Sequence, residues 1–188
     1  MTLKQTDWFR DPPQRLVDDQ GADDGNAGAR MLIVIRHGDA RDKSTWKGPD
    51  LRRPLSPLGR RQAEGLVFQL EDYPIERIVC SPTLRCRQTV EPLARDRLLE
   101  IEPAAALGVG AGPAEVRSVF WEWQLDNVVL CTHGEMISQL FRQLVVEELE
   151  VAEPLDWPKG SAWLLRRTRQ HVHARFLAPL ALDPAHTR

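Results

Sequence analysis

The residues of this sequence best suited to chemistry are two histidines, His37 and His133, each followed directly by glycine. Arg36 stands immediately before His37, and Arg85 lies between the two histidines in the chain. Two guanidinium forks and two imidazoles around one space would suit a tetrahedral oxyanion, for which phosphate is the obvious candidate. A neutral imidazole can attack phosphorus directly, while arginines neutralise charge on the equatorial oxygens during transfer. These four residues therefore indicate phosphoryl chemistry, and they require no metal.

The four side chains can meet only if the elements that carry them are neighbours in a sheet. Residues 31–35 (MLIVI) have no polar alternation and are rich in β-branched side chains, which predicts a strand covered on both faces. Residues 76–80 and 127–131 predict two further strands. Parallel sheets place ligands beyond the carboxyl ends of their strands. We therefore expect Arg36, His37, Arg85 and His133 to line one crevice.

Helices are predicted between these strands. Ser56-Pro57 offers an N-cap and a first-turn proline for a helix over residues 57–71, and Ser81-Pro82 begins a second helix that Pro92 should end or kink. The other predicted elements are a strand at 98–101, a loop at 103–112, a helix starting at Pro113, a helix after His133, and strands at 161–166 and 171–176. This alternation predicts an α/β fold, a three-layer α/β/α sandwich with a mostly parallel central sheet.

Length and composition favour one globular domain. The 188 residues divide into a flexible acidic arm (1–30), a domain (31–180) and a C-terminal tail (181–188). The net charge of -2 gives no global attraction to nucleic acid or membrane, so neither is expected as a partner. Three cysteines without C-x-x-C spacing suggest reduced thiols. With no membrane span or signal peptide apparent, a cytoplasmic location is expected.

Three motifs resemble the signatures of the histidine phosphatase superfamily, also called phosphoglycerate mutase-like. They are Ile35-Arg36-His37-Gly38, the segment SPTLRCRQT at residues 81–89, and Thr132-His133-Gly134. The similarity spans about residues 31–145. The runs RHGDA and RRPLSPLGRRQAE look like the small bacterial SixA-type phosphohistidine phosphatases, and like the phosphatase domain joined to Nudix domains in some bacterial proteins.

The resemblance implies roles for individual residues. His37 would become transiently phosphorylated, with its other ring nitrogen held by a backbone carbonyl. Arg36, Arg85 and His133 would complete the phosphate pocket, beside Gly38 and Gly134. Mutase-type members have an asparagine six positions after the nucleophile, where this chain has Lys43, with Arg41 close by. Either cation is expected to supply a further substrate contact.

One departure from the family pattern bears on the substrate. Many members protonate the leaving oxygen with a glutamate before the third helix, but the comparable stretch at residues 104–108 (AAALG) has none. A general acid typically contributes about 10²–10⁴-fold, most for poor leaving groups such as alkoxides. Phosphohistidine and phosphoric anhydrides are therefore expected as substrates in preference to alcohol esters. Glu102, Glu115 and Glu135 are the candidate substitutes.

Three function classes follow. The leading one is a metal-independent phosphatase that needs no cofactor and acts on phosphohistidine protein or on a small phosphorylated metabolite or nucleotide. The second is a mutase-type phosphotransferase, which the missing acid disfavours. The third is a non-catalytic phosphate-binding module. The oligomeric state is left open by the sequence.

Overall fold

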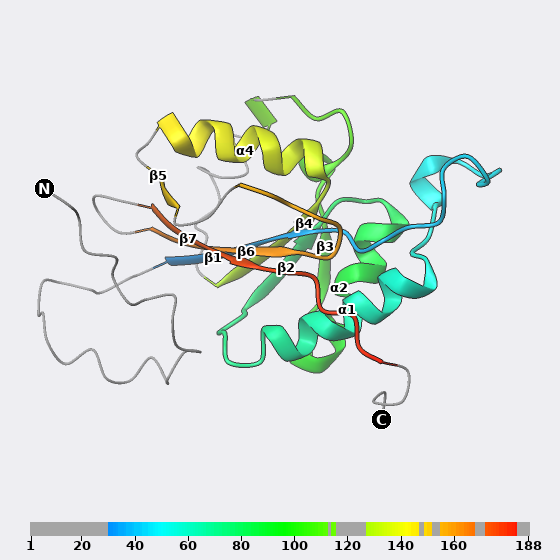
Figure 1. Ribbon diagram of the computed structural model, residues 1–188, viewed down its shortest axis with the longest axis horizontal. Coiled ribbons are helices and arrows are strands. Elements are labelled where there is room, and N and C mark those ends of the chain that lie inside the picture. The colour runs from blue at the N-terminus through cyan, green and yellow to red at the C-terminus, as the bar shows by residue number, and fades with distance from the viewer. Residues whose placement is uncertain are drawn as a thin grey trace, which may run out of the picture.

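A seven-stranded mixed sheet forms the centre of the described part of the chain (Figure 1). This computed structural model describes residues 30–112, 114–115, 127–146, 149–151, 155–167 and 172–183. The strands, in spatial order, are β3 (Ile101–Pro103), β2 (Arg77–Cys80), β4 (Val128–Thr132), β1 (Arg30–Arg36), β6 (Ala162–Arg167), β7 (Val172–Leu177) and β5 (Leu149–Val151). Strands β1, β2, β3 and β4 pair in parallel, as does β5 with β7, whereas β6 is antiparallel to β1 and β7. The predicted mostly parallel sheet is confirmed.

Helices cover both faces of this sheet. Figure 1 shows α1 (Pro57–Gln69) and α2 (Leu84–Arg97) on one side and α4 (Gly134–Val146) on the other. Two short 3-10 helices, η2 (Asp50–Arg52) and η3 (Ala105–Leu107), lie in the loops after β1 and β3. The predicted three-layer sandwich is therefore confirmed. None of the helices within the described ranges is long and apolar enough to cross a bilayer.

Strand β1 is buried on both faces, as its sequence predicts. Leu32 and Val34 pack in the hydrophobic cluster that contains the buried apolar side chains of α4 between Met136 and Phe141. Ile33 and Ile35 pack in a second cluster with those of α1 and α2. Alternate side chains of a strand point to opposite faces, so an unbroken aliphatic run can supply both cores at once. This fixes β1 centrally and directs the residues that follow it to the sheet edge.

The predicted start of α1 is confirmed. Ser56 is the N-cap and its hydroxyl accepts a hydrogen bond from the backbone N–H of Gly59 at 3.1 Å, while Pro57 is the first helical residue. The missing N–H of proline costs no hydrogen bond at this position, because the first N–H groups of a helix have no partner within the helix. The helix ends at Gln69, two residues before the predicted boundary.

Two predicted boundaries need correction: of the end or kink predicted at Pro92 the end is wrong, and the third strand lies further along the chain. The second helix does not end at Pro92 but continues to Arg97, since Val90, Leu93 and Ala94 on either side of the proline are buried against the sheet. That burial offsets the roughly 3 kcal/mol cost of proline within a helix. The strand predicted at residues 98–101 occupies Ile101–Pro103 instead. Leu98 is the C-cap of α2 in the left-handed conformation, with φ of 56°, and cannot begin a strand.

Other expectations differ in detail or fall outside the described residues. Strand β5 was not predicted; its three residues pair with β7 at the end of the described strand order and carry little sequence signal. The predicted loop at 103–112 contains η3. The acidic arm (except Arg30) and most of the helix predicted from Pro113 lie outside the described residues. In the predicted tail, Leu182 donates a backbone hydrogen bond to Arg61, so the start of that segment lies along α1.

Candidate active site

The carboxyl ends of β1, β2 and β4 meet at one edge of the sheet. Arg36 pairs with Thr132 in register, and Cys80 pairs with Cys131, so the residues that follow these strands lie side by side. The backbone N–H of His37 donates to the carbonyl of Thr132 at 3.0 Å, which fixes the exit of β1 against β4. The imidazoles of His37 and His133 are thereby brought to a centroid separation of 5.1 Å.

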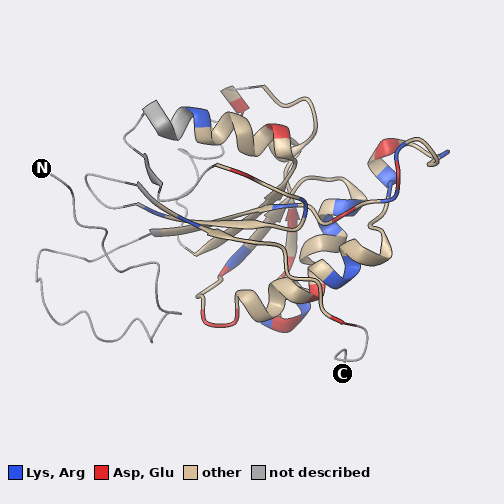
Figure 2. Ribbon diagram, in the orientation of Figure 1, with Lys and Arg blue, Asp and Glu red and all other residues tan. Residues whose placement is uncertain are grey.

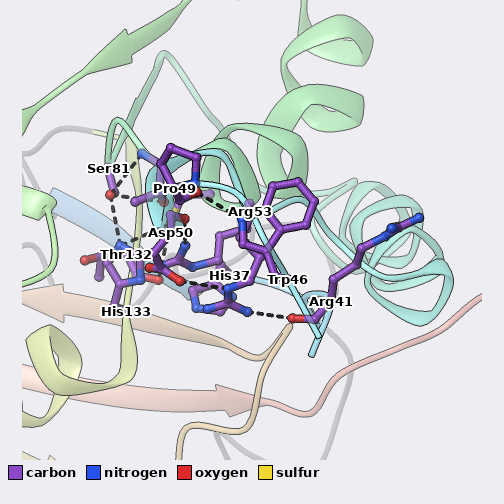
Figure 3. Close-up of polar contacts among 12 residues, drawn as sticks. His37, Arg41, Trp46, Pro49, Asp50, Arg53, Ser81, Thr132 and His133 are labelled. Carbon is purple, nitrogen blue, oxygen red and sulfur yellow. Dashed lines mark hydrogen bonds and ion pairs between the residues drawn. The ribbon is translucent and has the colours of Figure 1, made fainter. Parts of the chain in front are cut away.

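The described residues around these rings form an open pocket of about 920 Å³. All four predicted catalytic residues line it: Arg36, His37, Arg85 and His133. Figure 3 shows the two histidines close together at the strand ends, with Asp50 and Arg53 of the loop between β1 and α1 beside them. The predicted convergence of residues far apart in the chain is present.

His37 is held in one ring orientation. Its side chain is buried, and Nδ1 lies 2.8 Å from the carbonyl oxygen of Gly38. A carbonyl can only accept, so Nδ1 carries the proton and Nε2 is left with its lone pair when the ring is neutral. Burial lowers the pKa of His37 from 6.5 to about 4, and it outweighs the opposite effects of Cys86 and of the hydrogen bond to Gly38. The ring is therefore neutral at physiological pH.

His133 is held by a hydroxyl from the neighbouring strand end. Its Nε2 atom lies 2.9 Å from the Oγ atom of Ser81, the residue that directly follows β2. Both side chains are buried, at 3% and 0% exposure. The Sγ atom of Cys86 lies 3.7 Å from the same ring nitrogen. Ser81 therefore contacts a residue of the site and also forms part of the turn before α2. Its place at the start of the second motif is the sequence signal by which this role could have been found.

Both arginines present buried donors at the pocket. Arg85, only 2% exposed, projects from the first turn of α2, and its Nη1 atom donates to the carbonyl of Asp50 at 2.9 Å. Arg36 donates from Nη1 to the carbonyl of Trp157 at 2.6 Å. The Nε atoms of both arginines are buried and have no hydrogen-bond partner among the described residues. Buried donors without a partner are costly, so an anion bound here would be stabilised by satisfying them.

Three of the four residues predicted to bind substrate line the pocket: Arg41, Lys43 and Gly134. Arg41 and Lys43 are exposed in the loop after β1, a segment in which Figure 2 shows basic and acidic residues interspersed. Gly134 begins α4, and a Cβ atom there would lie 3.1 Å from Cζ of Arg36. The glycine therefore lets the guanidinium lie against the amino end of the helix, where the helix dipole also favours an anion.

Gly38 has a different place from the one predicted. It is absent from the described lining of the pocket. Instead its carbonyl accepts from His37, and its N–H donates to Oγ1 of Thr89 on α2 at 2.9 Å. A Cβ at this position would approach the carbonyl oxygen of Gly59 to 2.9 Å, so a residue without a Cβ is needed here. Its backbone orients His37 and packs against α1.

A second network at the pocket edge was not predicted. Lys159, in the turn before β6, contacts the carboxylate of Asp39 at 2.8 Å, and Ser56 donates to the same carboxylate at 2.6 Å. Partial burial disfavours the charged carboxylate, but these two hydrogen bonds outweigh it and hold the pKa of Asp39 below its usual range. Because β6 runs antiparallel to β1, its amino end lies where β1 ends. Lys159 reaches the site only through that arrangement, which no motif in the sequence reveals.

The three glutamates considered as proton donors differ in whether they line the pocket. Glu102 forms a two-point contact with Arg77 and, like Glu115, lies outside the described pocket lining. Glu135, at the start of α4, lines the pocket. Across the part of the chain with described coordinates, no group of three or more His, Cys, Asp or Glu side chains is placed to hold a metal ion.

Comparisons with known proteins bear on the family and the fold of the chain. The sequence model of the histidine phosphatase superfamily (branch 1) matches residues 32–108. An 8-oxo-(d)GTP phosphatase of Mycolicibacterium smegmatis is 34% identical over 156 residues, which cover 80% of this chain. The chain spans about half of that relative's length, namely 48%.

Solved structures with low sequence identity share the fold. The protein histidine phosphatase SixA in complex with tungstate has a TM-score of 0.59 at 20% identity, covering 79% of this chain and 97% of that one. The α-ribazole phosphatase of Shigella flexneri has a TM-score of 0.62 at 17% identity, covering 78% of this chain and 95% of that one. With its three motifs gathered at one sheet edge, the chain belongs to the histidine phosphatase superfamily.

Proposed function

We propose that this protein is a metal-independent phosphatase that works through a phosphohistidine formed on His37. The observation that carries the proposal is the contact between Nδ1 of His37 and the carbonyl of Gly38, which leaves Nε2 as an unprotonated nucleophile at neutral pH. Arg36 and Arg85 place guanidinium groups beside it, where a phosphoryl group would carry negative charge.

In the first step, the Nε2 lone pair of His37 forms a bond to phosphorus as the bond from phosphorus to the leaving group breaks. The leaving group departs with that electron pair. Arg36 and Arg85 stabilise the charge on the remaining phosphoryl oxygens, and the amino end of α4 at Gly134 adds its dipole. His133, held by Ser81, completes the wall of the site.

In the second step, water attacks the phosphorus of phosphohistidine. The bond from phosphorus to Nε2 breaks and its electron pair returns to the imidazole, while the proton lost by the attacking water passes to solvent as inorganic phosphate forms. The released ring is again neutral, because its burial opposes protonation. The site is thereby restored for another cycle.

The acids in the pocket favour substrates with good leaving groups. Asp39 is paired with Lys159, and Asp50 with Arg53 and Arg85, so the described contacts hold both as carboxylates. Of the three candidate proton donors only Glu135 lines the described pocket, and a site with so few such acids handles anhydrides and phosphohistidine better than alkoxide esters. The relative named for 8-oxo-(d)GTP, a nucleoside triphosphate, supports the anhydride class. We therefore propose phosphohistidine proteins and nucleotide or metabolite anhydrides as the substrate classes.

A substrate panel in the presence of EDTA tests this proposal. Phosphohistidine peptide, nucleoside di- and triphosphates, and a sugar phosphate would be compared by phosphate release. We expect the first two classes to be hydrolysed at least about tenfold faster than the sugar phosphate, with no loss on adding EDTA. Equal rates on the sugar phosphate would contradict the substrate assignment, and inhibition by EDTA would contradict the metal-free mechanism. Transfer of phosphate to a second alcohol would indicate a phosphotransferase instead.

A further inference from the structure

The carboxylate of Asp50 binds two arginines of the pocket at once, Arg85 and Arg53, the second of which is labelled beside it in Figure 3. Oδ1 lies 2.8 Å from Nε of Arg53, and Oδ2 lies 3.1 Å from Nη2 of Arg85. The backbone carbonyl of Asp50 also accepts from Nη1 of Arg85 at 2.9 Å. An acidic residue of the chain itself therefore bridges the guanidinium of Arg85, which is expected to hold the phosphoryl group, and the guanidinium of Arg53.

The two sides of this contact differ in how firmly they are held. The Arg85 side chain is 3% exposed, whereas that of Asp50 is 44% exposed. Asp50 lies on η2, a three-residue turn without a buried residue. A buried guanidinium requires an anionic partner, but an exposed carboxylate on a short turn is cheap to move. The Arg85 guanidinium is therefore held in place, whereas the Asp50 carboxylate can be displaced.

Arg53 does not depend on Asp50 for its position. Its side chain is only 13% exposed, and Nη1 donates to the backbone carbonyl of Arg41 at 2.8 Å. If Asp50 moved away, this second contact would keep the guanidinium at the pocket, beside Arg85. Hydrogen bonding to Arg53, with further help from the charge of Arg85, holds the pKa of Asp50 below its usual range, so the carboxylate is charged at neutral pH. It is thus an oxyanion competing with any other oxyanion for the same donors.

We propose that Asp50 occupies an anion-binding position shared by Arg85 and Arg53, and that a phosphoryl group of the substrate takes this position by displacing the carboxylate. Arg53 is then a third phosphoryl-binding arginine, beside Arg36 and Arg85. The inference rests on the proposed function only for the identity of the anion. A carboxylate and a phosphoryl group both present oxygens that match an arginine fork, so the exchange needs no rearrangement of the buried residue.

The exchange has a consequence for affinity. An anion must compete with Asp50, so its apparent affinity is reduced by the fraction of molecules in which the carboxylate remains bound. Removing the charge of Asp50 should therefore strengthen anion binding. If Asp50 served only to orient Arg85, the same change would weaken binding, because the guanidinium would lose its support. The two roles predict effects of opposite sign.

The test uses inorganic phosphate as the probe and isothermal titration calorimetry as the readout. We expect D50N to bind phosphate about threefold to tenfold more tightly than wild type. The matched control is D42N, which also removes a carboxylate from the pocket mouth, although Asp42 contacts Ser44 rather than Arg85. It reports the general effect of one lost negative charge, expected to be less than about twofold. An effect of D50N that is absent, no larger than that of D42N, or of opposite sign would overturn the proposal.

A second pair of variants tests Arg53. In the D50N background, R53Q should weaken phosphate binding by about threefold to tenfold, because one charged donor is lost. An unchanged affinity would show that Arg53 does not contact the anion. Neither measurement requires turnover. Tight phosphate binding with the expected responses, but no hydrolysis, would refute the proposed function and support the exchange at Asp50. Hydrolysis without these responses would support the proposed function and refute the exchange.

Discussion

The imidazoles of His37 and His133 meet edge to face, with centroids 5.1 Å apart and planes inclined at 67°. At this separation a positive charge on one ring opposes a charge on the other, and both rings are almost fully buried. Each ring is oriented by a separate contact, His37 by the carbonyl of Gly38 and His133 by the hydroxyl of Ser81. The pair is therefore arranged around a neutral His37.

His37→Ala should abolish covalent phosphorylation. With a labelled substrate and rapid acid-free quenching, wild-type protein should carry an acid-labile phosphoryl group, and the variant none. Turnover should fall by at least about 10³-fold, since the nucleophile is lost. Phosphate affinity, measured by calorimetry, provides the control that the pocket is intact. A variant that retains labelling would show that another residue is the nucleophile.

The low pKa of His37 predicts a pH-dependent stability. The unfolded imidazole titrates near 6.5 and the folded one at about 4, so between these values the unfolded state binds more protons and stability falls as the pH falls. The loss should be on the order of 3 kcal/mol across this window, following the size of the shift. Urea unfolding of wild type and of His37→Gln at about pH 7.0 and about pH 4.5 would measure this loss of stability. A stability difference between the proteins that did not change with pH would contradict this prediction.

Gly134→Ala should impair the site more than the fold. The added Cβ would lie 3.1 Å from Cζ of Arg36, whose Nη1 atom is tied to the carbonyl of Trp157, so the guanidinium must shift. We expect kcat/KM to fall by about tenfold, as displacement of one charged phosphoryl contact would produce. Alanine favours helix, so the melting temperature should change little. Unchanged kcat/KM would mean that Arg36 contributes nothing from its present position.

Gln62→Leu should loosen the pocket edge. The buried amide accepts from the N–H of Asp39 at 2.8 Å and donates to the carbonyl of Lys159 at 3.0 Å, which joins the exit of β1 to the turn before β6. Loss of both bonds should lower the free energy of unfolding by about 2 kcal/mol. Gln69→Leu, which removes one bond to the carbonyl of Ala178, is the control and should cost roughly half as much or less. Equal effects would show that the bridge is not specific.

Much of the fold could be predicted because its signals are local. The aliphatic run of β1 indicates burial on both faces, and Ser56-Pro57 marks the start of α1. The errors arose where tertiary packing outweighed local preference. Helix α2 continues past Pro92 because the residues around it are buried, and Leu98 caps that helix instead of beginning a strand.

The sequence by itself determined that His37, His133, Arg36 and Arg85 follow or adjoin strand ends, since each lies in a short motif whose residues are consecutive. Only the tertiary structure decided what else reaches them. The antiparallel placement of β6 beside β1 brings Lys159 to Asp39, and the turn of η2 lays Asp50 across Arg53 and Arg85. Contacts between segments far apart in the chain depend on strand order and loop path, and neither is encoded in a local pattern of residues.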